Sequence, residues 1–284
     1  MSRNTSRGSN PGGAGPPAES LLDLKEQPQG RNAFTELMAP KPKQHNPQLP
    51  KKDPISTSHK VSSLCKSRDG LGEYIENPSS FPPTRVLYYN DDFVAIHDLY
   101  PKSSLHLLLL PCDPTKTHLH PFDAFEDLDF LRKVQKETKK LKQFAAAELR
   151  RMYSTVSAQE RARQEAMDAD PPPDELPPGR DWEKEIMCGI HAHPSMNHLH
   201  IHVLAVDRFS SCLKHRRHYN SFSTPFFIDV QDFPLAKDDV RRHPGKEGYL
   251  RWDIKCWRCG RMFGNKFKQL KDHLEEEFLD WRTL

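Results

Sequence analysis

The sequence predicts an α+β fold of strands and one long helix, preceded by a disordered tail and followed by a small metal-binding domain. Residues 198–204 alternate between histidine and apolar side chains, as in a strand that buries one face. Between residues 121 and 150, apolar side chains recur at spacings of three and four, which is typical of one face of a helix. Near the C-terminus, Cys256 and Cys259 precede His273, an arrangement typical of zinc ligands.

Residues 1–75 are expected to form the disordered tail. The 284-residue chain has 25 prolines and a mean hydropathy of −0.79, and this segment carries Pro-rich and Gly-rich runs with few side chains to bury. Within the tail, Phe34, Leu37 and Met38 share one face of a short helix. That face would suit docking on a partner protein; the alternative is an incidental apolar cluster.

Several features predict a soluble intracellular protein. The N-terminus is polar and lacks a signal-peptide pattern, and the apolar run at 107–110 is too short to span a bilayer, so no membrane partner is expected. Apart from one close pair, the six cysteines are scattered, which favours a reducing compartment. We expect a nuclear location, which is favoured by four lysines in the tail, Lys41, Lys43, Lys51 and Lys52.

The remaining elements follow in order along the chain. Aliphatic and aromatic runs between turn residues predict strands at 86–89, 93–96, 105–110, 185–192 and 198–204. The helix at 121–150 has acidic residues early and Arg150 at its end, which suits the helix dipole. Residues 154–180 are charged and proline-rich, so we expect a mobile insertion between the helix and the sheet.

The alternating strand carries the chemistry. Its apolar face would hold Leu199, Ile201 and Val203, and its other face three imidazoles, those of His198, His200 and His202. Such a row could be without function, bind a metal, or bind a phosphorylated substrate. No cysteine or carboxylate flanks the row, and three zinc ligands usually come from more than one element, so phosphate chemistry is favoured.

Positive charge is concentrated in the C-terminal part. The net charge is only +3, but residues 208–271 contain 15 Lys and Arg against 6 Asp and Glu. Such an excess favours a polyanion as partner, although a solvated basic surface would have the same composition.

The pattern His-φ-His-φ-His-φ-φ, where φ is apolar, resembles the signature of the histidine-triad superfamily of nucleotide hydrolases and transferases. The flanking blocks at 189–197 and 211–222, together with the C-terminal cysteine pair, resemble the aprataxin family of DNA 5′-adenylate hydrolases. The resemblance covers residues 80–284. It implies a histidine-triad-type antiparallel sheet with helices as the catalytic domain, at 76–232, and a zinc-finger DNA-binding domain at 233–284.

The resemblance also implies roles for the imidazoles. The middle histidine, His200, would be the nucleophile that forms a covalent AMP–histidine intermediate, since a neutral imidazole is a competent nucleophile near pH 7. His198 and His202 would donate to the phosphate or orient His200. His191 matches a further family histidine that binds phosphate or assists the leaving group.

Three more residues would bind the nucleotide. Asp98 fits a family carboxylate that accepts hydrogen bonds from the ribose hydroxyls, although an Asp that stabilises a turn would look the same. Ser195 and the backbone N–H of Met196 fit a phosphate-binding turn. His193 has no clear family counterpart and is left out of the expected site.

DNA would be held by cationic side chains. Lys214 and Arg217 are expected to reach the phosphodiester of the substrate strand. The expected sequence-independent phosphate contacts of the finger are Arg258, Arg261, Lys266 and Lys268.

The C-terminal ligands predict a structural zinc ion. Cys256, Cys259 and His273 would supply three ligands, unless the cysteines are ordinary buried thiols. No histidine follows His273, and Glu277 lies one helical turn further on, so the family resemblance implies a Cys-Cys-His-Glu site with Glu276 as the rival fourth ligand.

Together these features predict a DNA repair hydrolase that removes AMP from 5′-adenylated nicks or ends. RNA–DNA junctions are a further expected substrate, a repair protein an expected partner of the tail, and a monomer the expected state. The alternatives are a small-molecule nucleotidyl hydrolase or transferase of the superfamily, and a non-catalytic module that binds DNA or RNA ends.

Overall fold

The structure is a computed structural model and describes residues 68–284. The predictions for the tail before residue 68, including the short helix with Phe34 and the tail lysines, lie outside the described residues.

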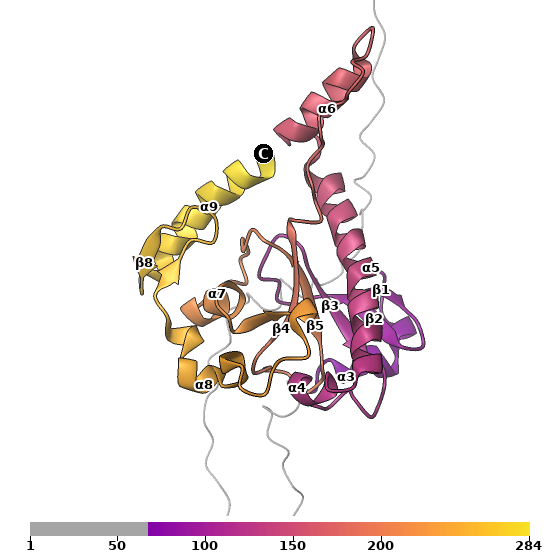
Figure 1. Cartoon of the computed structure of the whole chain (residues 1–284), viewed down its shortest axis with the longest axis vertical. Helices are drawn as coiled ribbons and strands as arrows, with labels where there is room; N and C mark the ends of the chain where they lie inside the picture. Colours follow the sequence, from indigo (N-terminus) through magenta and orange to yellow (C-terminus); the bar gives the residue numbers. More distant parts are fainter. Residues whose placement is uncertain (1–67) are drawn as a thin grey trace, which may run out of the picture. The chain divides into compact units, whose positions relative to one another are not determined.

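A six-stranded antiparallel sheet forms the centre of the fold, which confirms the predicted α+β class (Figure 1). The strand order is β1-β2-β3-β5-β4-β6, so β5 lies between β3 and β4. The strands are β1 (Val86–Tyr89), β2 (Phe93–His97), β3 (His106–Pro111), β4 (Ile186–His191), β5 (Ile201–Ala205) and β6 (Phe227–Asp229).

The histidine-bearing strand begins later than predicted. We expected it to begin at residue 198, but β5 begins at Ile201. The N–H of Leu199 donates to the carbonyl of Thr117, outside the ladder of the sheet. The alternation rule therefore applies to the residues of β5 but not to His198, because the backbone there is not pleated with the sheet.

One face of the sheet is covered by a long helix, α5 (Leu128–Tyr153). Its apolar stripe, including Val134, Leu141 and Leu149, is fully buried. The side chain of Asp127 caps the first turn by accepting the N–H groups of Asp129 and Phe130. The predicted helix at 121–150 is divided, because the chain turns after a short α4 (Pro121–Ala124) before α5 begins.

The opposite face of the sheet is covered in part by residues that we assigned to the tail. Residues 68–75 contribute Leu71 and most of helix α3 (Gly72–Glu76), followed by a 3-10 turn, η1 (Pro78–Ser80). Leu71 packs with Val94, Ile96, Leu108 and Leu110, which alternate with the residues facing α5. Structure therefore begins before the predicted boundary at residue 75, because Leu71, Tyr74 and Ile75 anchor a segment whose composition resembles the tail.

The segment 154–180 was expected to be a mobile insertion; its mobility stays a prediction, but the segment has local structure. The segment contains helix α6 (Ala158–Asp168) and is held at both ends. The N–H of Gln159 donates to the carbonyl of Leu284, and buried Glu160 accepts a 2.8 Å hydrogen bond from the indole of Trp182.

A buried group that we call the Arg180 cluster (Arg180, Trp182, Glu185 and Trp281) holds the other end. The guanidinium of Arg180 lies over the rings of Trp182 and Trp281, at 4.4 and 4.8 Å from their centroids. It donates to the carbonyl of Trp281 and to Glu185, whose second oxygen accepts the indole N–H of Trp281. The cluster therefore ties the segment before β4 to the C-terminal helix.

The C-terminal part contains a small β-hairpin and a helix, shown in orange and yellow in Figure 1. Its own core includes Leu213 and Tyr219, which come from the segment before the hairpin. The hydroxyl of Tyr219 donates to the carbonyl of Lys255 and accepts the N–H of Trp257. The elements are α7 (Arg216–Ser223), η2 (Val230–Asp232), η3 (Val240–Arg242), α8 (Pro244–Glu247), η4 (Tyr249–Arg251), β7 (Ile254–Lys255), β8 (Met262–Gly264) and α9 (Phe267–Thr283).

Within residues 68–284, no helix has both the length and the apolar character needed to cross a bilayer.

We predict that Gly189→Ala lowers the free energy of unfolding by about 1–3 kcal/mol, as overpacking does. A Cβ at Gly189 would lie 2.4 Å from the carbonyl oxygen of Ile228 and 2.8 Å from the ring of Phe227, so β4 and β6 would have to separate. Chemical denaturation measures the change. Gly245→Ala is the matched control, because nothing lies within 4 Å of its added Cβ; equal stability of the two variants would contradict the argument.

Candidate functional site

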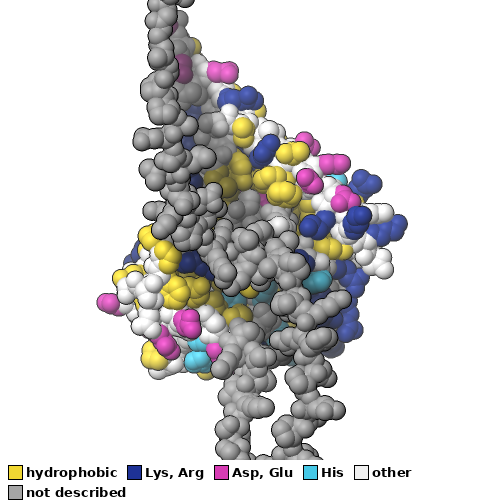
Figure 2. All heavy atoms as spheres, turned by 180° about the vertical axis from the view of Figure 1, so that it is seen from behind, with side chains coloured by type: hydrophobic (Ala, Val, Ile, Leu, Met, Phe, Trp, Pro, Cys, Tyr) yellow, Lys and Arg dark blue, Asp and Glu magenta, His cyan; other side chains and the backbone are white. Residues whose placement is uncertain are grey.

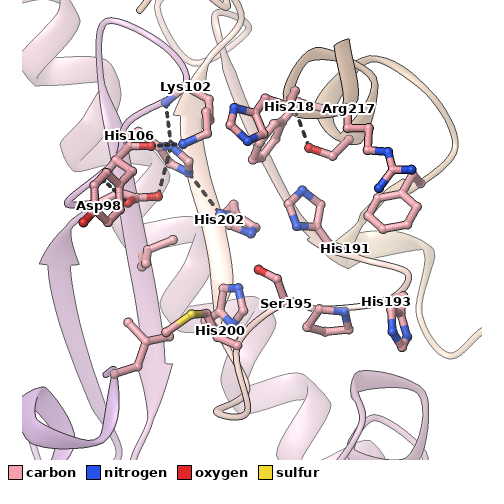
Figure 3. Close-up of a pocket in the computed structure, with 18 of the residues that line it drawn as sticks. Asp98, Lys102, His106, His191, His193, Ser195, His200, His202, Arg217 and His218 are labelled. Carbon is pink, nitrogen blue, oxygen red and sulfur yellow. Dashed lines mark hydrogen bonds and ion pairs between the residues drawn. The ribbon is translucent and has the colours of Figure 1, made fainter. Parts of the chain in front are cut away.

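A cavity of about 1300 Å³ opens beside β5. Its walls come from α3, the β2–β3 loop, the segment after β4, α7 and residues 244–251. The polar residues that line it and are labelled in Figure 3 are Asp98, Lys102, His106, His191, His193, Ser195, His200, His202, Arg217 and His218.

The orientation of the His200 ring is fixed by the backbone of His198. Its Nδ1 lies 2.7 Å from the carbonyl oxygen of His198. Because a carbonyl can only accept, Nδ1 carries the proton and donates. Burial lowers the pKa of His200, so the ring is neutral near pH 7 and Nε2 keeps its lone pair. The geometry thus leaves an unprotonated ring nitrogen on a residue that lines the cavity.

A second chain of hydrogen bonds fixes the ring of His202. The backbone N–H of Lys102 donates to Nδ1 of His106, and Nε2 of His106 lies 3.0 Å from Nδ1 of His202. Burial lowers the pKa of His106 to about 4, so this ring is neutral and its single proton is on Nε2. His202 then carries its proton on Nε2, a buried atom without a hydrogen-bond partner among the described residues. It is a donor available to an oxygen atom in the cavity.

His191 and Asp98 lie beside this chain of hydrogen bonds. The ring of His191 is 4.5 Å from that of His202, centroid to centroid, and its Nε2 also lacks a partner among the described residues. Asp98 accepts the N–H of Tyr100 and lies 3.3 Å from Nδ1 of His106. Asp98 therefore stabilises a turn, the alternative reading of this residue, and lines the cavity as well.

Ser195 and Met196 line the cavity on the side of α3. The carbonyl of Ser195 accepts a 3.0 Å hydrogen bond from Nε of Arg68. His193, which we left out of the expected site, lines the same cavity from an exposed position.

His198 does not lie where the alternation predicts. Its ring packs on His118, with centroids 4.5 Å apart, and under Gly72, where a Cβ would approach its Nε2 to 2.9 Å. It is absent from the cavity lining. The physical reason is the late start of β5, which turns this side chain away from that of His200. Only its carbonyl contributes, through the hydrogen bond to His200.

Two cationic side chains were predicted near the substrate strand, and a third was missed. Arg217 lines the cavity, whereas Lys214 is exposed and does not line it. Lys102 lines it too, and burial lowers its pKa, with a smaller lowering by the charge of Lys214. Sequence reasoning missed Lys102 because it stands in a loop without a pattern.

The four predicted zinc ligands lie together in the C-terminal domain. One ligand atom from each of Cys256, Cys259, His273 and Glu277 lies within 4.8 Å of all the others. Nε2 of His273 is 3.1 Å from Sγ of Cys259 and 3.0 Å from Oε1 of Glu277. Two sulfurs, an imidazole and a carboxylate match the four-coordinate donor sets that bind zinc.

The rival ligand Glu276 points elsewhere. Its carboxylate is 3.9 Å from the other ring nitrogen of His273, and its side chain is 82% exposed. The side chain of Glu277 is only 9% exposed.

The basic residues of the finger differ in their surroundings. Arg261, Lys266 and Lys268 are exposed. Figure 2 shows Lys and Arg side chains gathered at the right of the view, where the C-terminal elements lie. Arg258, which we predicted to contact DNA, instead donates to Glu277 at 2.6 Å. The arginine between the two cysteines thus faces an acidic partner on α9, and its contact with DNA stays a prediction.

Comparison with known families gives two matches. Residues 81–209 match the HIT domain, and residues 223–280 match the C2HE / C2H2 / C2HC zinc-binding finger.

Two aprataxin-like proteins are among the curated relatives that cover most of the chain. The "Aprataxin-like protein" of Schizosaccharomyces pombe is 36% identical over 75% of this chain and 82% of its own. That of Saccharomyces cerevisiae is 33% identical over 74% of this chain and 95% of its own.

Among solved structures, the "aprataxin ortholog Hnt3 in complex with DNA" is 35% identical, with a TM-score of 0.60 over 76% of this chain and 96% of its own. The same ortholog from Schizosaccharomyces pombe, described without DNA, has a TM-score of 0.60 at 34% identity, over 78% of this chain and 97% of its own.

We predict that the free energy of unfolding falls as the pH falls from 6.5 toward 4. An unfolded histidine takes up its proton near pH 6.5, whereas folded His106 does so near pH 4, so acid favours the unfolded chain throughout this window. Burial lowers the pKa of His191, His200 and His202 as well, and these shifts act in the same direction.

Denaturation at a series of pH values measures this dependence. In His106→Gln the slope between pH 6.5 and 4 should decrease by up to one proton. A slope that is unchanged in this variant would contradict the assignment of His106 as a neutral buried ring.

Proposed function

The chain belongs to the aprataxin family of histidine-triad proteins, and we propose on this premise that it is a DNA repair hydrolase that removes AMP from 5′-adenylated DNA ends. The observation that carries the proposal is the ring of His200, neutral and held with its unprotonated nitrogen available in a cavity lined by donors and cations. The relatives support the substrate class, since Hnt3 is described in complex with DNA.

The reaction would proceed in two displacements at the α-phosphorus. Nε2 of His200 attacks the phosphorus of the adenylate, the N–P bond forms, and the bond to the bridging oxygen breaks. The DNA leaves with its 5′-phosphate, and AMP stays on the histidine. Water then attacks the same phosphorus, the N–P bond breaks, and AMP is released with the neutral imidazole restored.

Fixed donors would stabilise the negative charge that develops on the phosphoryl oxygens. The Nε2–H of His202 needs no reorientation, because the ring is held through His106 by the backbone at Lys102. The ammonium group of Lys102 and the guanidinium of Arg217 add positive charge at the cavity. His191 would bind the phosphate or assist the leaving group from beside His202.

DNA would lie across the C-terminal domain. The cavity wall includes residues 244–251, so a substrate that fills the cavity contacts this domain. The exposed cations Lys214, Arg261, Lys266 and Lys268 would contact phosphates without reading sequence. We extend the proposal to RNA–DNA junctions, a monomeric state, a repair-protein partner of the tail and a nuclear location.

A bound zinc ion would supply folding free energy to this domain, so its role would be structural. Cys256, Cys259, His273 and Glu277 would hold it, since their ligand atoms cluster.

The substrate preference tests the proposed function. The full chain is incubated with 5′-adenylated nicked DNA and, separately, with a dinucleoside polyphosphate and an AMP-lysine phosphoramidate. We expect a strong preference for the DNA. Preference for the free nucleotides would indicate a small-molecule nucleotidyl hydrolase, and no turnover of any substrate would indicate a binding module.

We predict that His200→Ala lowers turnover of adenylated DNA about a thousandfold or more, as loss of a covalent nucleophile does, while DNA affinity changes little. The wild-type enzyme stopped with denaturant should carry radiolabelled AMP, and this variant should not. His243→Ala is the control, because this imidazole is exposed and lies outside the cavity lining. Labelling of the His200 variant at the wild-type level would remove His200 from the nucleophile role.

We predict that Glu277→Ala lowers the zinc content of the purified protein, whereas Glu276→Ala leaves it at about one equivalent. The reason is the position of the Glu277 carboxylate beside Nε2 of His273, against the exposed position of Glu276. Elemental analysis after dialysis against a weak chelator measures both. The reverse order of the two variants would identify Glu276 as the ligand.

A further inference from the structure

The donor set of the C-terminal site differs in charge from the more familiar set with two histidines. Zn²⁺ bound by two thiolates and two neutral imidazoles has no net charge. Replacing one imidazole by the carboxylate of Glu277 adds one negative charge in a place where that side chain is only 9% exposed. An uncompensated charge at such a position is costly, so a cation is expected beside it.

Arg258 is that cation. Its Nη1 donates to Oε2 of Glu277 at 2.6 Å. The same Nη1 lies 3.8 Å from Oδ2 of Asp280, an exposed residue. The two oxygens of Glu277 thus have different partners, because Oε1 faces Nε2 of His273 at 3.0 Å. One oxygen points to the ligand cluster and the other is held by the arginine.

The sequence position of Arg258 makes this contact part of the site itself. The residue lies between Cys256 and Cys259, so the turn that presents the two sulfurs also presents the guanidinium. The side chain of Arg258 is only 27% exposed, so most of it is not accessible to solvent. An arginine already engaged with a carboxylate is poorly suited to bind a DNA phosphate, because that would require breaking a charge-assisted hydrogen bond.

We propose that Arg258 is a positioning residue for the metal site, which holds Glu277 as a ligand through Oε1 alone and offsets the negative charge that this glutamate adds. The inference rests on the proposed zinc site. Hydrogen-bonded partners of metal ligands of this kind typically contribute 10- to 100-fold in metal affinity.

Four forms of the full chain test the proposal as a double-mutant cycle: wild type, Arg258→Gln, Glu277→His, and the two changes together. Zinc affinity is measured by competition with a chromophoric chelator. We expect Arg258→Gln to weaken zinc binding about 10- to 100-fold in the wild-type background. In the Glu277→His background the same change should have little effect or strengthen binding, because a neutral imidazole needs no cation beside it.

Two further variants separate charge from structure. Arg258→Lys keeps the positive charge and should recover most of the affinity lost in Arg258→Gln. Arg261→Gln is the matched control, since this arginine is exposed and lies over the ring of Phe263 rather than beside Glu277. Its zinc affinity should equal that of the wild type.

The spectrum of the cobalt-substituted protein provides a second readout. Its d–d bands report the donor set, and they should change in Arg258→Gln if the carboxylate shifts its binding mode, but not in Arg261→Gln. This measurement remains informative if Glu277→His fails to fold.

The outcomes distinguish this proposal from the zinc site on which it rests. Wild-type chain that retains no zinc would overturn both. Normal zinc binding that depends on Glu277 but not on Arg258 would overturn only the role of Arg258. Equal losses from Arg258→Gln in both backgrounds would also overturn it, because they would show a structural effect independent of the glutamate.

Discussion

The site depends first on the hydrogen bond from Nδ1 of His200 to the carbonyl of His198. This carbonyl is available because the chain joins the sheet only at Ile201, so it is not used by the ladder. The bond decides which ring nitrogen carries the proton, and burial keeps the ring neutral. A regular strand from residue 198 would use the carbonyl of His198 in the hydrogen bonds of the sheet. Nδ1 of His200 would then lack this acceptor, and the tautomer of the ring would not be fixed. The irregularity at the start of β5 is therefore part of the chemistry.

The C-terminal helix α9 serves two parts of the molecule at once. Its first half packs Leu270 and Leu274 into the small core of the finger, and its second half packs Phe278 and Trp281 into the main core. The ligand atoms of His273 and Glu277 lie between these halves. The Arg180 cluster then holds the end of the helix against the segment before β4. Because α9 packs in both cores, the position of the finger is coupled to that of the catalytic sheet.

Local patterns were sufficient to predict much of the fold and part of the site. The strands, the long helix, the cysteine pair and two of the three histidines in the row, His200 and His202, are each readable from a few neighbouring residues, because period and ligand spacing are local properties. His106 was missed for the opposite reason. It stands at the start of an apolar strand, and only the pairing of β3 with β5 brings it to His202. Arg68 and Lys102 likewise lie in segments without periodicity, where tertiary contact alone decides their position.

Two segments have more structure than their composition indicates, for one physical reason. Composition reports how much apolar area a segment can bury by itself, and both 68–75 and 154–180 have little. Each is ordered instead by a few contacts to a surface that already exists: Leu71 on the sheet, and Glu160 and Arg180 on tryptophans. The local composition does not reveal that Arg180 is buried. Its burial depends on the rings of Trp182 and Trp281, and without them the guanidinium would be solvated. Contacts with the partner surface offset the conformational entropy that such a segment loses when it is ordered. Its structure can therefore be inferred from sequence only when that surface is known as well.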